Sequence, residues 1–282
     1  MITKEQIIEA ILQAGIHRGD VIALNSSLSS MGQVSGGAKT VVEAFVEVVG
    51  DRGTLLVPTF TYSLKQWSNF PPFNPVMTPS LCGEITEAVR LWPGAVRSYH
   101  PTHSTATLGF FARELAKDHH KCTPLGKGTP YHKLSQMGGL VVLLGVGMNR
   151  NPLIHTCEVL AKLPYLSIPW SNNKTGIDVA RQYDDNGKIV EVEISEVPGC
   201  SEGFVKLESV LQKRGIVQIA PIGNTVMQVM KAENVVDIVL HILKEDPLFL
   251  LCKNPECGIC PRRRKYAKSL LNPKKSGLPD KV

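Results

Sequence analysis

Short apolar runs alternate with amphipathic stretches along most of this chain. Val21–Leu24 and Leu55–Val57 are continuous apolar runs, and apolar residues recur at helical spacing over Val41–Val49 between them. Short apolar runs predict buried strands, and spacings of three and four residues predict an amphipathic helix. Strand, helix and strand within about 40 residues have the size of one right-handed parallel crossover. The N-terminal half is therefore predicted to be α/β.

The later part of the chain has a second pattern. Thr175–Ile194 alternates in the manner of strands around Asp184–Gly187, which predicts a β-hairpin. Helices are predicted over Glu202–Arg214 and Thr225–Leu243, with a strand at Val217–Ile219 between them. The expected fold is α/β: a mixed, largely parallel central sheet flanked by helices, with an antiparallel insertion at about 175–195.

The first twenty residues predict a helix and not a leader. Thr3 and Gln6 match a capping box, and Ile7–Leu12 supplies an apolar face. Charged residues interrupt any signal-peptide core, and no apolar run approaches the roughly 18 residues that span a bilayer. We therefore expect a cytoplasmic protein with no membrane partner.

Composition indicates a globular protein with a basic end. The 282 residues are 43% hydrophobic and 20% charged, and the net charge of +6 is concentrated late, from Arg262 onward. We expect one domain over residues 1–261 and a basic tail over 262–282. A solvated terminus is favoured over a nucleic-acid-binding tail, because only Tyr266 offers a stacking ring. A monomer and a homodimer both stay open.

The cysteines do not suggest a disulfide framework, because their number, seven, is odd and they are widely spread. Cys252, Cys257 and Cys260 are spaced like part of a metal or redox cluster. A structural zinc site usually needs four ligands, and no nearby His or Cys supplies the fourth. A compact turn with reduced thiols is therefore favoured, and completion of the site by a second subunit stays open.

A candidate general base follows the apolar run that ends at Gly145–Gly147. Pro152 opens a predicted helix that carries His155 and, three residues later, Glu158. Residues three apart share a helix face, so the carboxylate can hold one imidazole nitrogen and leave the other free to accept a proton. The alternative is a structural histidine.

Two polar segments complete the candidate chemistry. Ser63–Pro79 is rich in proline and aromatic residues and predicts an ordered pocket wall or lid. His100 and His103 flank a proline and suit either a binding loop or a hydrogen-bonded turn. Together with His155 they suggest an alternative zinc-dependent hydrolase, although His-x-x-His on a Pro-containing loop is not a standard helical ligand pair.

Ordered motifs along most of the chain resemble the aminoglycoside 3-N-acetyltransferase family. They run in sequence over roughly residues 5–250 and comprise Ser26–Gly32, Gly36–Ala38, Gly53–Leu55, Pro58-Thr59, Gly83-Glu84, Arg90, Arg97-Ser98, His100-Pro101, Ser104, Ala106, Gly109, Leu144–Gly147, His155 and Glu158.

The resemblance implies an acetyl-CoA-dependent N-acetyltransferase with a fold unlike the GNAT fold and no metal in the reaction. It implies that His155, oriented by Glu158, deprotonates a small-molecule amine, and Ser104 is our candidate oxyanion donor. It places acetyl-CoA on Ser26, Ser27, Leu28, Ser29, Gly36, Gly37, Arg97, Ser98, His100, His103 and Ser104. It places the acceptor on Thr59, Tyr62, Glu84 and Asn149.

Two departures from the family pattern affect the expected acceptor. Asn25 stands where family members usually have His, and Met148-Asn149 stands where resistance enzymes often carry Trp-Asp. Aminoglycosides carry several ammonium groups and suit an acid-lined pocket. The 3-amino group of an aminoglycoside is the default acceptor, and a non-catalytic CoA- or polyanion-binding protein is a further alternative.

Overall fold

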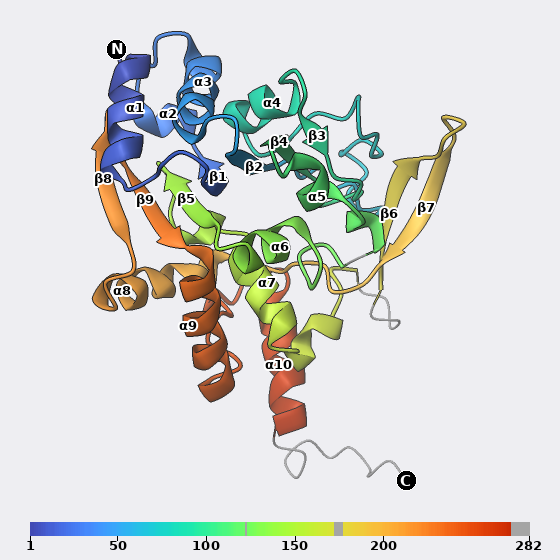
Figure 1. Ribbon diagram of the computed structural model, residues 1–282. Coiled ribbons are helices and arrows are strands. Elements are labelled where there is room, and N and C mark those ends of the chain that lie inside the picture. The colour runs from blue at the N-terminus through green and yellow to red at the C-terminus, as the bar shows by residue number, and fades with distance from the viewer. Residues whose placement is uncertain (122, 172–176, 272–282) are drawn as a thin grey trace.

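A mixed sheet of seven strands forms the centre of the molecule, with helices on both faces (Figure 1). The computed structural model describes residues 1–121, 123–171 and 177–271. In spatial order the strands are β3 (Val96–Arg97), β4 (Thr105–Gly109), β2 (Thr54–Pro58), β1 (Val21–Ser26), β5 (Leu140–Leu144), β9 (Thr225–Lys231) and β8 (Gln218–Ile222).

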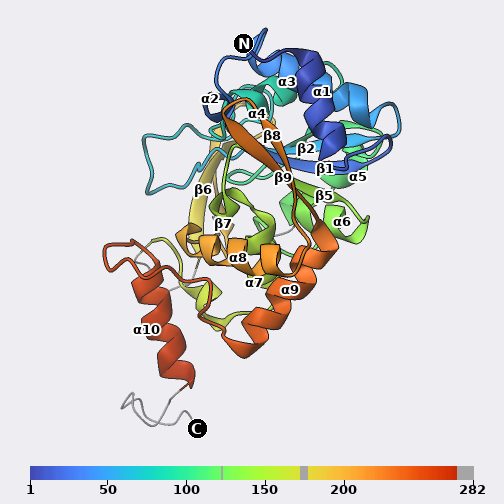
Figure 2. The same cartoon turned by 90° about the vertical axis from the view of Figure 1, so that its left-hand side faces the viewer.

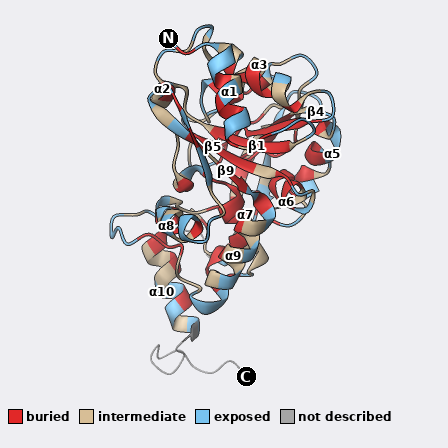
Figure 3. Ribbon diagram, turned by 60° about the vertical axis from the view of Figure 1, so that its left-hand side comes forward, coloured by how far each residue is buried: buried red, intermediate tan, exposed pale blue. Residues whose placement is uncertain are grey.

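The central strands are buried on both faces because their side chains alternate between two cores. In β1, Val21 and Ala23 point into one core, and Ile22 and Leu24 into the other. One face is covered by α1 (Lys4–Gln13), α3 (Gly37–Val49) and α4 (Glu84–Arg90). The other is covered by α5 (Ala112–Ala116), α6 (Pro130–Gln136), α7 (Leu153–Leu160), α8 (Lys206–Lys213) and α9 (Ala232–Glu245). Figure 3 shows the buried residues gathered along β1, β5, β9 and α7.

The mixed sheet with flanking helices is confirmed, but the expectation that it is largely parallel is wrong. β1 is parallel to β2 and to β5, while the other pairings, β2 with β4, β3 with β4, β5 with β9 and β8 with β9, are antiparallel. The error lies partly in Thr225–Leu243, predicted as one helix. Its first seven residues form β9, which turns back from β8 through Gly223 and Asn224. A Gly-Asn pair between two apolar runs is a hairpin signal.

The predicted antiparallel insertion is present as β6 (Asp178–Tyr183) and β7 (Ile189–Ile194). This hairpin lies at the opposite side of the molecule from β8 and β9 (Figure 1). Isolated bridges join it to the long segment after β2, Leu64 to Ala180 and Phe73 to Gln182. Residues 172–176, where the predicted hairpin segment begins, lie outside the described residues.

The predicted boundary between residues 261 and 262 falls inside a helix, α10 (Cys260–Leu271). α10 lies at the end of the molecule remote from α1, as two perpendicular views show (Figures 1 and 2). Its arginines point back to the domain: Arg263 is 1% exposed and donates to the Val197 carbonyl at 2.9 Å, and Arg264 donates to the Cys252 carbonyl at 2.7 Å. This part of the predicted basic tail therefore belongs to the folded domain, and residues 272–282 lie outside the described residues.

The remaining short elements are α2 (Leu28–Met31) and the 3-10 turns η1 (His119–Lys121), η2 (Met148–Arg150), η3 (Pro164–Ser167) and η4 (Glu202–Val205). At the N-terminus the capping box of Thr3 and Gln6 is formed as predicted. Among the described residues, no helix is both long enough and apolar enough to cross a bilayer.

Candidate active site

A cavity of about 660 Å³ opens where the carboxyl ends of β1 and β5 meet. Because the two strands are parallel neighbours, the loops that follow them lie at one edge of the sheet. The backbone N–H of Ser27 donates to the carbonyl of Leu144 at 2.9 Å. Gly145 turns the chain out of β5 with a φ of +67°, and a Cβ there would lie 2.8 Å from the Ser30 Cβ. The site therefore needs glycine at this position.

His155 faces this cavity from the first turns of α7, and Glu158 lies behind it on the same helix. Nδ1 of His155 lies 2.6 Å from Oε2 of Glu158, and the other carboxylate oxygen accepts the Tyr165 hydroxyl at 2.7 Å. His155 lines the cavity, whereas Glu158 is 3% exposed and lies behind it. Both carboxylate oxygens are thus occupied, and Nε2 is the imidazole nitrogen left to exchange a proton.

The charge of Glu158 is retained despite its burial. Burial raises the pKa of this carboxyl, but the hydrogen bond and charge of His155, the Arg263 guanidinium and the Tyr165 hydroxyl together bring the pKa below its ordinary value. An ionised carboxylate on Nδ1 fixes the orientation of the imidazole and stabilises the imidazolium. The pair has the arrangement of an oriented general base.

The predicted cofactor residues divide into two groups. Ser26, Ser27, Leu28 and Ser29 line the cavity together with His103. The others are absent from its described lining: Gly36, Gly37, Arg97, Ser98, His100 and Ser104.

Arg97, Ser104 and Thr59 form a buried network behind the cavity wall. Arg97 donates to Ser104 Oγ at 3.0 Å and to the Thr59 carbonyl at 2.9 Å, and Ser104 Oγ donates to that same carbonyl at 2.8 Å. Burial lowers the pKa of Arg97 to about 10, which leaves it charged at neutral pH. Since the hydroxyl proton of Ser104 is already engaged, this network supports the wall of the cavity.

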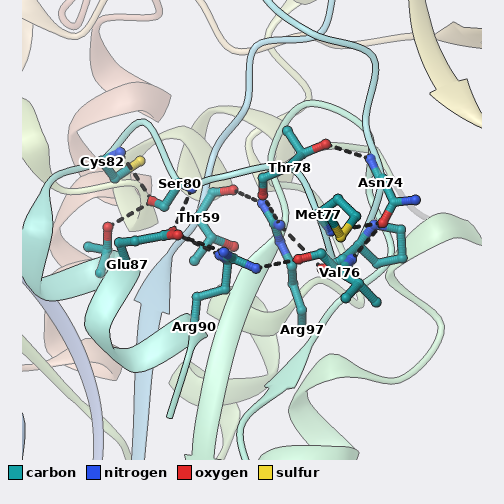
Figure 4. Close-up of polar contacts among 12 residues, drawn as sticks. Thr59, Asn74, Val76, Met77, Thr78, Ser80, Cys82, Glu87, Arg90 and Arg97 are labelled. Carbon is teal, nitrogen blue, oxygen red and sulfur yellow. Dashed lines mark hydrogen bonds and ion pairs between the residues drawn. The ribbon is translucent and has the colours of Figure 1, made fainter.

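Arg97 and Arg90 also fasten the long segment after β2 (Figure 4). Arg97 donates to the Thr78 carbonyl, and Arg90 donates to the Val76 carbonyl at 2.6 Å while pairing with Glu87. The predicted wall is thereby held through its backbone. Of the aromatic side chains in the predicted wall, Trp67 lines the cavity. Phe60 and Tyr62, which immediately precede that segment, line it as well, and Tyr62 is among the predicted acceptor contacts.

The histidines proposed as zinc ligands do not form a ligand set. His100 Nδ1 accepts the backbone N–H groups of Thr102 and His103, at 3.3 and 3.1 Å. The pKa values of His100 and His103 are lowered by burial and by neighbouring histidines, which keeps both rings neutral. Within the described part of the chain, the side chains grouped closely enough to hold a metal are cysteines. The zinc-hydrolase alternative is therefore not supported.

Asn25, which sequence reasoning noted only as a departure, occupies a distinctive place. It is 2% exposed, lines the cavity, and its Oδ1 accepts the Tyr131 hydroxyl at 3.2 Å. Among the described residues its Nδ2 has no hydrogen-bond partner, and neither has the neighbouring Ser26 Oγ. A buried donor without a partner costs about 1–3 kcal/mol, so a ligand that accepts from it is favoured.

Charged groups at the cavity are sparse. Apart from histidines, the ionisable Asp, Glu, Lys and Arg side chains among its described lining residues are Glu84, itself a predicted acceptor contact, and Arg150, which follows the predicted acceptor residue Asn149 in sequence. Two acidic side chains outside this lining are already engaged: Glu87 pairs with Arg90, and Asp184 accepts from the backbone of its own hairpin turn. Thr59, also predicted to contact the acceptor, belongs to the buried network.

A His–Glu pair facing a cavity at the ends of parallel strands is an arrangement found in α/β enzymes. The family model of aminoglycoside 3-N-acetyltransferases matches residues 24–244. The chain therefore belongs to the aminoglycoside 3-N-acetyltransferase family. The resemblance predicted from the sequence is confirmed.

The relatives differ in how much of this chain they match. Aminoglycoside N(3)-acetyltransferase IX of Micromonospora chalcea is 35% identical over 57% of this chain, a match that spans 63% of the relative's length. A solved mutant of AAC(3)-IVa, in complex with a gentamicin, is 26% identical with a TM-score of 0.82, covering 94% of this chain and 97% of that one. AAC-IIIb in its binary complex with CoASH shares the fold, with 24% identity, a TM-score of 0.73, and 86% and 96% coverage.

Proposed function

We propose that this protein is an acetyl-CoA-dependent N-acetyltransferase that acetylates the 3-amino group of an aminoglycoside. The observation that carries the proposal is the His155–Glu158 pair, at 2.6 Å, facing a cavity in a chain of this family. An alkylammonium has no lone pair, so a base must remove a proton before the nitrogen attacks a thioester. His155 Nε2 accepts that proton while Glu158 holds Nδ1.

The cavity offers contacts suited to both substrates. Backbone and hydroxyl groups of Ser26–Ser29 suit the acyl donor, and apolar side chains such as Phe60 and Leu125 suit its uncharged arm. Glu84, Asn149 and Tyr62 are the acceptor contacts of the proposal. AAC(3)-IVa was solved with a gentamicin and AAC-IIIb with CoASH, and these two ligands define the substrate classes to be tested.

Asn25 replaces Ser104 as the proposed oxyanion donor. As the amine nitrogen bonds to the acetyl carbon, negative charge develops on the carbonyl oxygen until the carbon–sulfur bond breaks and the CoA thiolate leaves. Nδ2 of Asn25, unpartnered among the described residues, is a buried donor at this cavity, whereas the Ser104 proton is directed at the Thr59 carbonyl. A donor aimed at the developing charge contributes about 10²–10³-fold in kcat.

A thiol-release assay with acetyl-CoA and a panel of aminoglycosides tests the proposal. His155→Gln is expected to lower kcat by about 10²–10⁴-fold, and Glu158→Gln to lower it by less. Thr156→Val is a matched control on the same helix, since the buried Thr156 hydroxyl has no hydrogen-bond partner in the described part of the chain. Full turnover in His155→Gln contradicts the base assignment.

A second pair of variants separates stabilisation of the oxyanion by Asn25 from the binding of acetyl-CoA. Asn25→Ala is expected to lower kcat while the KM for acetyl-CoA changes little, and Asn25→His should recover part of the loss by restoring an N–H donor. Equal kcat in Asn25→Ala and the natural protein contradicts the assignment. A cytoplasmic location and a monomeric or homodimeric state remain predictions.

A further inference from the structure

Four cysteines from separate segments converge near the start of α10. Cys200 precedes η4, Cys252 follows α9, and Cys257 and Cys260 bound the turn into α10. Their sulfur atoms all lie within 4.8 Å of one another. The fourth ligand that the sequence pattern lacked near Cys252–Cys260 is thus supplied by this same chain.

The spacing of the sulfur atoms suits a tetrahedral metal site. With zinc–sulfur bonds of about 2.3 Å, the sulfurs of a Cys₄ site lie about 3.8 Å apart, so small side-chain rotations close the cluster. A disulfide requires about 2.0 Å and joins only two sulfurs. We propose that Cys200, Cys252, Cys257 and Cys260 bind one structural zinc ion.

The backbone is arranged to stabilise thiolates in this cluster. The N–H of Glu202 lies 3.4 Å from the Cys200 sulfur. Metal ligands are commonly oriented by such outer hydrogen bonds.

Nearby cations match the charge that such a site carries. Four thiolates and one Zn²⁺ have a net charge of −2. Arg264 donates to the Cys252 carbonyl at 2.7 Å, and Lys206 lies 3.4 Å from the Leu251 carbonyl. These side chains offset the negative charge of the zinc–thiolate unit.

The site is closed and therefore structural. Sulfur fills all four positions, which leaves none for water or substrate. The ion would join two parts of the chain that matter for the cavity: Gly199 and Ser201, which line it on either side of Cys200, and the first turn of α10, from which Arg263 reaches Val197. The proposal does not depend on the acyl-transfer assignment.

Metal analysis of the full-length protein tests this inference. The protein is produced in zinc-supplemented medium, purified without chelators, and measured by plasma mass spectrometry. One zinc ion per chain is expected. Titration of the thiols with an organomercurial should release that zinc, and a chromogenic chelator detects its release. Exchange for Co²⁺ should give the absorption bands of tetrahedral thiolate coordination.

Variants identify the ligands. Cys200→Ser and Cys257→Ser are expected to weaken zinc binding by at least about 100-fold in competition with a chelator. Cys82→Ser is the matched control, because Cys82 is a free thiol outside the cluster, and it should keep one zinc ion. If the cluster variants fail to fold, the organomercurial titration of the natural protein still decides the matter.

Three results would overturn the proposal. The first is protein that holds no zinc as purified or after incubation with Zn²⁺ under reducing conditions. The second is disulfide bonds among the four cysteines in protein purified under reducing conditions. The third is stoichiometric iron in place of zinc.

Discussion

The guanidinium carbon of Arg263 lies 5.8 Å from the centre of the Tyr165 ring, whose hydroxyl donates to Glu158 at 2.7 Å. An arginine on the last described helix is thereby connected to the carboxylate that orients His155. Its charge is also among the causes that lower the pKa of Glu158. The C-terminal segment thus contributes to the electrostatics of the candidate base.

Replacing Arg263 should shift the pH dependence of acetyl transfer. In Arg263→Met the pKa of Glu158 rises, because a stabilising positive charge is lost. The acidic limb of the kcat profile should then move to higher pH. Lys265→Met is the control, since Lys265 is exposed on the same helix. Identical acidic limbs in the two variants would show that Arg263 does not act on Glu158.

Removing the Tyr165 hydroxyl should weaken the base without abolishing it. Tyr165→Phe leaves Glu158 Oε1 buried without its donor, which costs about 1–3 kcal/mol. If half of that loss appears in the transition state, kcat falls about tenfold or less. Steady-state kinetics and a chemical unfolding curve separate the loss of activity from the loss of stability. An unchanged kcat together with a lowered free energy of unfolding would assign Tyr165 to packing.

Thr156→Val should stabilise the protein. The Thr156 hydroxyl is buried in α7 and finds no hydrogen-bond partner among the described residues, so its replacement by a methyl group removes a desolvation cost. The free energy of unfolding should rise by about 1 kcal/mol, measured by urea denaturation, with kcat unchanged. A destabilised variant would show that the hydroxyl has a partner in solution.

Gly145→Ala should damage the site because the new Cβ would crowd the Ser27–Ser30 loop. Gly145 and Gly138 have similar backbone conformations, with φ of +67° and +70°, but a Cβ at Gly145 meets Ser30 at 2.8 Å and one at Gly138 meets no described atom within 4 Å. Both alanine variants carry the strain of positive φ, about 1 kcal/mol. Only Gly145→Ala should also raise the KM for acetyl-CoA. Equal KM values would show that the Ser27–Ser30 loop adjusts freely.

Stability should fall in mild acid because of buried histidines. The pKa values of His100 and His103 lie well below 6.5, and that of His119 is lowered by burial to about 4. As the pH falls below 6.5 the unfolded chain binds protons that the folded chain excludes. Each such histidine then lowers the free energy of unfolding by about 1.4 kcal/mol per pH unit. For His119 this loss extends over the window from pH 6.5 to about pH 4.

Urea unfolding between pH 7.5 and 5 checks this dependence. His119→Gln should reduce the slope of stability against pH, whatever its effect on stability at neutral pH. His17→Gln, at an exposed position, should leave the slope unchanged. A slope unaffected by His119→Gln would show that this ring is protonated in the folded protein.

Local patterns were sufficient to predict much of the fold. The apolar runs at β1, β2 and β5 are buried on both faces, and the spacing of His155 and Glu158 places both on one turn of α7. The sheet's antiparallel edges were missed because β9 and α9 are continuous in sequence, and an apolar stretch does not reveal where a strand becomes a helix.

The rest of the site depends on contacts between distant segments. Composition could not show that Arg97 and Ser104 bond to the Thr59 carbonyl rather than to a ligand. Nor could the spacing of Cys252, Cys257 and Cys260 reveal Cys200, which a separate loop brings to them. From the sequence, the arginines near residue 262 were predicted to be solvated, because charge alone does not reveal which carbonyl groups a side chain contacts in the fold.

The wall formed by the segment after β2 is anchored through main-chain carbonyls, those of Thr59, Val76 and Thr78, by Arg90 and Arg97. Every amino acid carries such a carbonyl, so the anchors do not depend on which side chains the segment displays. The side chains that this segment would present to an acceptor can therefore be substituted one at a time while the backbone keeps the same path. This separation makes the segment a natural place to alter acceptor range in a library, with the base and the sheet left untouched.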